Sequence, residues 1–300
     1  MMNEMTWNIP VVIDLFFAGL GGGSFCLAAI TSRKKGQGWD ACSRMASFLA
    51  PLALLIGLSM LIIDLGYRSR FWVTLKVFNL NSPMSIGVWL MSAFVLVSIW
   101  FALYSVPAHI RQRIPWIGRL SIWSRLEYRN RMGVIGTLFS VGVMVYTGVL
   151  LSVSIIPMWR ALSLPLLFFL SALSTGFAGG AILGMVSLSK RNLKAMKEPL
   201  RFLRQSYRII LPFYLLVALA FVLSLAISSV SRTEAIHFMT GWSGLIWWFG
   251  FVGIGIVFPL TIVMRKGEIK IPRAWFLFGS ILVGGFLLRL VLVLSGQGAL

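Results

Sequence analysis

Residues 9–30 of the chain read IPVVIDLFFAGLGGGSFCLAAI, and this stretch decides the fold. Its only charged residue is Asp14. A helix needs about 20 mostly apolar residues to cross the hydrocarbon core of a bilayer. The stretch therefore predicts a transmembrane helix.

Seven further stretches of the chain have a similar length and apolar character. Of the 300 residues, 58% are hydrophobic and only 12% are charged, whereas a soluble domain carries about 25% charged residues. The eight predicted spans are Ile9–Ile30, Met45–Gly66, Ser85–Pro107, Gly133–Ile156, Ser163–Leu188, Ile209–Ser229, Ser243–Met264 and Ala274–Ser295. The sequence thus predicts an all-α integral membrane protein with eight transmembrane helices.

The basic residues predict the orientation of these helices. The formal net charge is +19, and 21 of the 27 Lys and Arg residues follow the odd-numbered spans, whereas five follow the even-numbered spans. Lys and Arg accumulate in cytoplasmic loops. We therefore expect the odd loops in the cytoplasm and both termini in the periplasm, with the chain in the cytoplasmic (inner) membrane. Because the charges form short clusters between apolar runs, they indicate a membrane protein and no nucleic-acid partner.

The glycines of spans one and five recur at a spacing that favours close helix packing. Gly19 and Gly23 are four residues apart, as are Gly176, Gly180 and Gly184. Small residues at this spacing let helix backbones approach closely in lipid. We expect spans one and five to be central packing helices.

Three charged residues lie inside predicted spans, and each is a candidate functional residue because charge is costly in hydrocarbon. They are Asp14, Asp64 and Arg289. At 1.5 Å per residue, Asp14 lies about 7 Å and Arg289 about 9 Å from the outer ends of their spans. Tyr146 is expected deeper, near the middle of the membrane. For Asp64, near the end of its span, a solvated position at the headgroup level is the alternative.

Two carboxylates, a phenol and a guanidinium in the outer half of the bundle suit a quinone. A quinol loses protons from its two hydroxyl groups as its electrons leave, and a carboxylate can accept such a proton. A tyrosine or arginine can hold a quinone oxygen, and apolar walls accept the isoprenoid tail.

The histidines and cysteines argue against a fixed redox centre in the chain. His109 and His237 are predicted on opposite sides of the membrane, so they cannot ligate one haem together. Cys26 and Cys42 have no Cys-x-x-Cys neighbour, which makes zinc or iron–sulfur ligation improbable. We expect no haem or iron–sulfur cluster here.

Several stretches together resemble the NrfD/PsrC family, the membrane subunits of polysulfide-reductase-like complexes. They occur in the family's order along nearly the whole chain. They are Phe16–Phe25, Asp64–Gly66 with Arg70–Trp72, Asn81–Ser85 with Gly87 and Trp89, Tyr146–Ser152 with Pro157 and Trp159, and Gly285–Arg289 with Ser295–Gln297. Asn81 or Ser82 is also placed to cap span three, with Pro83 in its first turn.

The resemblance implies a fold, a cofactor and partners. It implies two four-helix bundles, residues 1–157 and 158–300, with the quinone site mainly in the first bundle and near the periplasmic face. It implies a bound menaquinone or ubiquinone at Asp14, Asp64, Tyr146 and Arg289, with Asp14 and Asp64 as the catalytic proton carriers. It also implies a periplasmic ferredoxin-like subunit with four 4Fe–4S clusters, and beyond it a molybdopterin or multihaem catalytic subunit.

The resulting hypothesis is a quinol dehydrogenase anchor of a respiratory oxidoreductase complex, of the kind used in anaerobic respiration, with no complete activity alone. It would exchange electrons between the quinone pool and the iron–sulfur subunit. The alternatives are a secondary transporter or ion-translocating membrane protein, and a structural anchor with a degenerate site. A transporter needs a polar site at the midplane, often on broken helices.

Overall fold

The computed structural model of the protein describes residues 7–64, 79, 82–106, 126–154, 156–188, 190–227 and 238–297. Within them, eight helices are long and apolar enough to cross a membrane, which confirms the predicted number. Seven spans are α1 (Ile9–Thr31), α2 (Gln37–Asp64), α4 (Pro83–Tyr104), α7 (Leu126–Ser152), α8 (Leu164–Ser187), α9 (Lys197–Ile227) and α13 (Ile271–Ser295). The remaining span joins α11 (Trp242–Leu245), the π-helix η5 (Ile246–Val257) and α12 (Phe258–Met264). Two short 3-10 helices, η3 (Pro157–Arg160) and η4 (Lys190–Met196), complete the described elements.

Three helices begin well before the apolar stretches that predicted them. Helix α2 begins at Gln37 rather than Met45, α7 at Leu126 rather than Gly133, and α9 at Lys197 rather than Ile209. Hydropathy marks where a helix enters hydrocarbon, whereas polar helix formers such as Arg, Lys, Gln and Glu continue a helix into water. These helices therefore extend past the bilayer on the side of the basic loops.

The predicted cap of the third span is confirmed at Ser82. Its side-chain oxygen accepts a hydrogen bond from the Ser85 N–H at 3.4 Å, and Pro83 occupies the first helical position. Asn81 lies outside the described residues. The segment has a local structural role whatever else it does, because the cap satisfies a free N–H at the helix start.

The seventh span is widened over η5. The Phe258 N–H donates to the Gly253 carbonyl, five residues back, as in a π-helix. Such turns are rare in proteins. Gly255 of η5 faces Gly284 of α13, and a Cβ on Gly255 would lie 2.7 Å from the Gly284 Cα. Glycine on both sides thus allows η5 and α13 to pack with their backbones close together.

Helices α1 and α8 form the centre of the molecule, as predicted. Buried residues make up 83% of the apolar stretch of α1 and 72% of that of α8, against 33% for α9. A Cβ on Gly176 would overlap the backbone of Gly23. Further along α8, a Cβ on Gly180 would lie 2.9 Å from the Ala46 Cβ, and one on Gly184 would lie 2.9 Å from the Cys42 Sγ. The glycine spacing of α8 therefore serves contacts first with α1 and then with α2.

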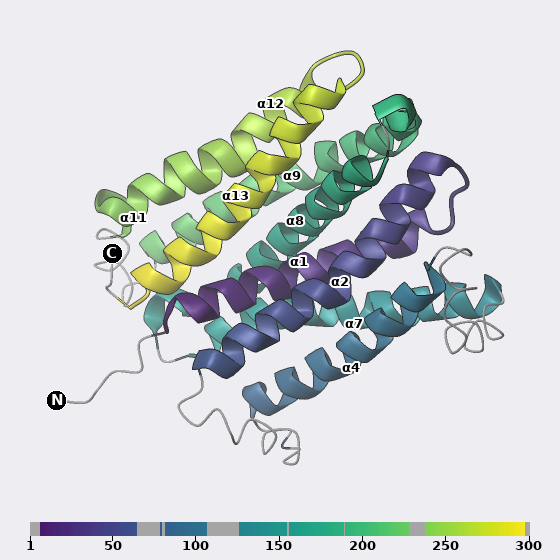
Figure 1. Cartoon of the computed structure of the whole chain (residues 1–300). Helices are drawn as coiled ribbons and strands as arrows, with labels where there is room; N and C mark the ends of the chain where they lie inside the picture. The colour runs from purple at the N-terminus through teal and green to yellow at the C-terminus, as the bar shows by residue number, and fades with distance from the viewer. Residues whose placement is uncertain are drawn as a thin grey trace.

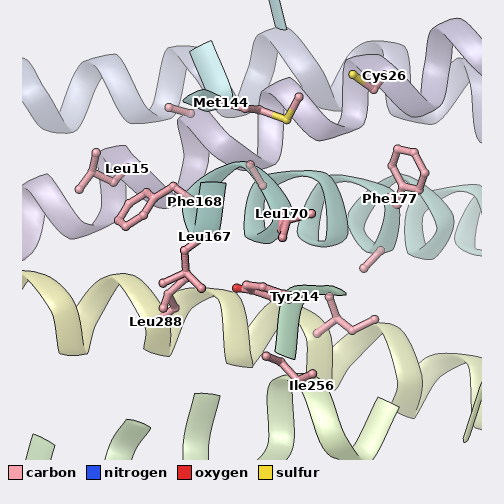
Figure 2. Close-up of a cluster of buried hydrophobic side chains, with 14 of the residues drawn as sticks. Leu15, Cys26, Met144, Leu167, Phe168, Leu170, Phe177, Tyr214, Ile256 and Leu288 are labelled. Atoms are coloured by element: carbon pink, nitrogen blue, oxygen red, sulfur yellow. The ribbon is translucent and has the colours of Figure 1, made fainter. Parts of the chain in front are cut away.

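The other helices surround this pair (Figure 1). Helix α1 contacts α2 and α7 of the first half of the chain, and α8 and α13 of the second half. Figure 2 shows α8 between α1 and α13, with Leu167 and Phe168 filling the space beside Leu15 and Leu288. The start of α1 and the end of α13 lie at one end, and the α12–α13 loop lies at the other. The division into two bundles stays a prediction, since α1 packs on helices of both halves.

Replacing Gly176 by alanine should destabilise the protein, because the added methyl group would force α1 and α8 apart. Overpacking of this kind costs about 1–3 kcal/mol of unfolding free energy. Gly279→Ala is the matched control, since a Cβ on Gly279 meets nothing within 4 Å. Denaturation midpoints in one detergent should fall for Gly176→Ala and hold or rise slightly for Gly279→Ala. Equal midpoints would contradict the assigned helix contact.

Candidate functional site

Asp14 lies buried in α1 with no partner for one of its oxygens. The residue is 4% exposed, and its Oδ1 makes no hydrogen bond to any described residue. Gly57 of α2 lies against it, so that a Cβ on Gly57 would come within 2.9 Å of Oδ1. The carboxylate therefore packs directly against the Gly57 backbone, at a place that any larger side chain would occupy.

Tyr146 of α7 lies near Asp14 and packs on a second glycine. A Cβ on Gly87 of α4 would overlap the Tyr146 ring, and the charge of Asp14 acts on the Tyr146 hydroxyl. The expected mid-membrane depth of Tyr146 stays a prediction, but the end of its helix lies closer to it than expected. Helix α7 ends at Ser152, so Tyr146 lies six residues, or about 9 Å, from that end. Pro157 opens η3 shortly afterwards, and the hydrophobic run that continues to Ile156 concealed this earlier helix end.

Asp64 lies apart from this pair. It is the last residue of α2 and is exposed. It follows Gly57 by two helical turns, or about 10 Å, and therefore projects from nearly the same face of α2. This position favours the solvated alternative that the sequence left open, in which Asp64 lies at the helix end and not beside Asp14.

Arg289 of α13 is fully buried on another side of α1. Its Nε donates to the Leu15 carbonyl at 2.9 Å, and its Nη1 donates to the Ser171 Oγ and to the Gly285 carbonyl, both at 2.7 Å. Its Nη2 lies against Gly19 and has no hydrogen-bond partner among the described residues. The guanidinium thus joins α13 to α1 and α8 and keeps one donor group free.

The four predicted residues do not form one cluster. Asp14 and Arg289 make no ion pair, and the only ion pair among the described residues joins Lys197 to Glu268. Asp14 faces α2 and α7, whereas Arg289 faces α8 and the Leu15 side of α1. The structure therefore brings together Asp14 and Tyr146, and gives Arg289 separate surroundings.

Two residues beside Arg289 escaped the sequence reasoning. One is Ser171 of α8, which accepts from the guanidinium. The other is Tyr214 of α9, whose buried hydroxyl lies near both Ser171 and Arg289. Figure 2 shows the Tyr214 hydroxyl pointing into the space between α8 and α13. Both are uncharged polar residues inside predicted spans, so a search that included hydroxyl groups would have found them.

Trp159, from the middle of the chain, forms a clasp with residues near the two chain ends. The Trp159 Nε1 donates to the Leu292 carbonyl at 2.8 Å, and its ring packs on that of Trp7 with centroids 5.2 Å apart. The Gln297 Nε2 donates to the Trp7 carbonyl at 3.1 Å, and the Gln297 Oε1 accepts from the Trp7 N–H at 2.5 Å. Trp159 and Gln297, which belong to the resemblance motifs, thus have a structural role.

An apolar groove of about 450 Å³ opens beside α1. It is lined by Phe16, Leu20, Leu49, Gly179, Ile182, Leu183, Leu282, Val283, Phe286 and Leu287. No polar side chain lines it, so it suits a hydrocarbon chain rather than a headgroup. Phe16 separates it from the Arg289 guanidinium, whose carbon lies 5.7 Å from the Phe16 ring centre.

The described residues contain no group of three His, Cys, Asp or Glu side chains that could hold a metal ion. His109 and His237 lie outside those residues. The expectation that the chain holds no haem and no iron–sulfur cluster therefore stays a prediction.

Eight long apolar helices with buried ionisable side chains define a multi-pass integral membrane protein. The family model "Polysulphide reductase, NrfD" matches residues 1–300. The chain belongs to the NrfD family, as the resemblance predicted.

Named relatives are similar to the chain over nearly its whole length. The C subunit of the polysulfide reductase of Wolinella succinogenes is 28% identical, over 98% of this chain and 95% of the relative. Protein NrfD of Escherichia coli is 26% identical, over 98% and 96%. The Hdr-like menaquinol oxidoreductase integral membrane subunit of Archaeoglobus fulgidus is 24% identical, over 98% and 72%. These relatives support a membrane subunit of an oxidoreductase complex with a function in electron transport.

Replacing Arg289 by leucine should leave the protein folded and close to its original stability. Two of its acceptors are helix carbonyls of Leu15 and Gly285, and a serine hydroxyl such as Ser171 can turn to its own helix backbone. Removing a buried cation that has no counter-charge spares its desolvation cost. We expect the unfolding free energy to change by no more than about 1 kcal/mol. A much larger loss on chemical denaturation would show that the guanidinium is needed for the fold itself.

Proposed function

We propose that the chain is the quinone-interacting membrane subunit of a respiratory oxidoreductase complex. It exchanges electrons between the quinone pool and an iron–sulfur subunit bound at its outer face. The observation that carries the proposal is the buried carboxylate of Asp14, which lies against Gly57 and near Tyr146 and whose Oδ1 has no hydrogen-bond partner among the described residues. Membership of the NrfD family and the menaquinol oxidoreductase relative support it.

The side chains of Asp14 and Tyr146 have the hydrogen-bonding groups that a quinone headgroup needs. An unsatisfied buried carboxylate oxygen is free to take a hydroxyl proton, and the Tyr146 hydroxyl is a hydrogen-bond donor for a carbonyl oxygen. A menaquinol or ubiquinol bound here would supply two electrons and two protons. Asp14 would accept the two protons one after the other, Tyr146 would orient the ring, and Asp64 at the end of α2 would pass each proton to water, while the electrons leave for the iron–sulfur subunit.

Arg289 acts from the other side of α1 in this proposal. Its hydrogen bond to the Leu15 carbonyl fixes the turn of α1 that carries Asp14. It is therefore a positioning residue, and its replacement by leucine lowers quinol-dependent turnover while the complex still assembles. Arg289→Lys should rescue part of the turnover, because lysine keeps the charge and a donor but not the forked geometry. Normal turnover in Arg289→Leu would remove Arg289 from the functional machinery.

A quinone-interacting membrane subunit of this kind needs partner subunits to receive its electrons. An electron carrier with four 4Fe–4S clusters would dock at the membrane face nearest Asp14, with a molybdopterin or multihaem subunit beyond it. The odd loops and their basic residues would then face the cytoplasm, and both termini the periplasm. The first four spans would form the bundle that holds the quinone.

The transporter alternative gains no support from the described spans. A transporter site is built near the midplane on broken helices. Asp14, Tyr146 and Arg289 lie within about 10 Å of one end of their helices, and each span is helical along its described length.

Purification in a mild detergent tests the proposal directly. Mass spectrometry of the co-eluting proteins and of the extracted lipids should find an iron–sulfur subunit and a quinone in the same fraction. A protein that elutes without an iron–sulfur subunit and without quinone would contradict the proposal and favour the transporter alternative.

Asp14→Asn should lower quinol-dependent electron transfer by about a hundredfold or more, because loss of a general base typically costs 10²–10⁴ in rate. Tyr146→Phe should lower it about tenfold through the loss of one hydrogen bond. Asp40→Asn is the matched control, since Asp40 is an exposed carboxylate at the opposite end of α2. Turnover should be measured in vesicles with a soluble quinol analogue. Equal rates for Asp14→Asn and Asp40→Asn would exclude Asp14 from proton transfer.

A further inference from the structure

A basic cavity of about 740 Å³ lies at the end of the molecule opposite Asp14. It is enclosed by the start of α9, the preceding η4 and the loop from α12 to α13. It is lined by Leu193, Lys194, Lys197, Leu200, Arg201, Arg204, Gly267, Glu268, Ile269, Lys270, Ile271 and Pro272. Five of these side chains are cations and one is an acid, so the lining carries a strong positive charge.

The wall of the cavity is built by Arg204. Its Nε donates to the Val263 carbonyl at 3.0 Å, and its two other nitrogens donate to the carbonyls of Arg265 and Gly267. The Val263 carbonyl belongs to the last turn of α12 and the other two follow its end, where a helix leaves its last C=O groups without partners. One guanidinium thus fixes the loop to α9, and the shape of the cavity does not depend on a ligand.

Three cations of the lining remain without a partner. The side chains of Lys194, Arg201 and Lys270 make no ion pair or hydrogen bond with the described residues. Lys197 pairs with Glu268 at 2.9 Å, but both side chains are more than half exposed, so the pair is weak. The cavity therefore offers free positive charge on a prebuilt frame.

The position of the cavity matches the level of a lipid headgroup. Ile271 is the first residue of α13, and Arg204 lies five residues, or about 8 Å, before Ile209, where the apolar part of α9 begins. This part of the cavity therefore lies near the level at which two spans meet the membrane surface. Leu193, Leu200 and Ile269 add apolar contacts beside the cations. A small inorganic anion would gain nothing from these apolar side chains, whereas the glycerol and first methylene groups of a phospholipid would pack against them.

We propose that this cavity binds the phosphate headgroup of an anionic phospholipid from the leaflet on the side of the basic loops. Basic pockets between transmembrane helices bind such headgroups. The proposal rests on this cavity alone and does not depend on the quinone site.

The test measures binding of phosphatidylglycerol to the purified full-length protein in phosphatidylcholine nanodiscs, by native mass spectrometry. The cavity variant combines Lys194→Gln, Arg201→Gln and Lys270→Gln. The control variant combines Lys35→Gln, Lys266→Gln and Arg273→Gln, which remove as much charge from the same face without touching the lining. Affinity should fall roughly tenfold to a hundredfold in the cavity variant and much less in the control. Equal losses, or none, would overturn the proposal.

A second variant keeps the test decisive if the cavity variant fails to fold. Glu268→Gln removes the only acid of the lining and releases Lys197, so phosphatidylglycerol should bind a few-fold more tightly, and unchanged or weaker binding contradicts the proposal. Competition identifies the ligand. Displacement of the lipid by an equal concentration of inorganic phosphate would show a free-anion site. An acidic partner protein lost from the cavity variant, with lipid affinity unchanged, would show a protein site.

Discussion

The contact between α1 and α8 at Gly23 and Gly176 is the constraint on which the rest of the structure depends. Lipid tails are as apolar as leucine side chains, so transmembrane helices gain little from burying apolar surface against one another. Close packing replaces that driving force, and it needs positions without side chains. The two glycines bring the backbones into contact, and α1 then becomes a helix with neighbours on every side.

Placing α1 at the centre separates the two buried ionisable groups. Asp14 points to α2 and lies against Gly57, while the carbonyl of its neighbour Leu15 points to α13 and accepts from Arg289. A direct ion pair would have neutralised both groups and left neither available. Because α1 keeps them apart, one oxygen of Asp14 and one nitrogen of Arg289 have no hydrogen-bond partner in the described part of the chain. Such unsatisfied groups are costly in a membrane and indicate function.

The two ends of the molecule are built on different chemistry. At the end that carries Asp14 and Tyr146, the contacts are aromatic rings and amide groups, such as the clasp of Trp7, Trp159 and Gln297. At the opposite end, Arg204 secures the α12–α13 loop through backbone carbonyls, and free cations line a cavity. The proposed electron transfer and the proposed lipid contact thus lie at opposite membrane surfaces.

The sequence by itself determined the eight spans, the central position of α1 and α8, the Ser82 cap and the family. These follow from apolar length, glycine spacing and local hydrogen bonding, which are properties of neighbouring residues. Residue position along a helix also gave the distances of Asp14 and Arg289 from the ends of their helices, although the early end of α7 brought Tyr146 closer to its helix end than expected. Only the tertiary structure decided which of these groups meet. Facing depends on helix rotation and on contacts between distant segments. The approach of Asp14 to Tyr146, and the hydrogen bond from Arg289 to Ser171, therefore could not be inferred from spacing.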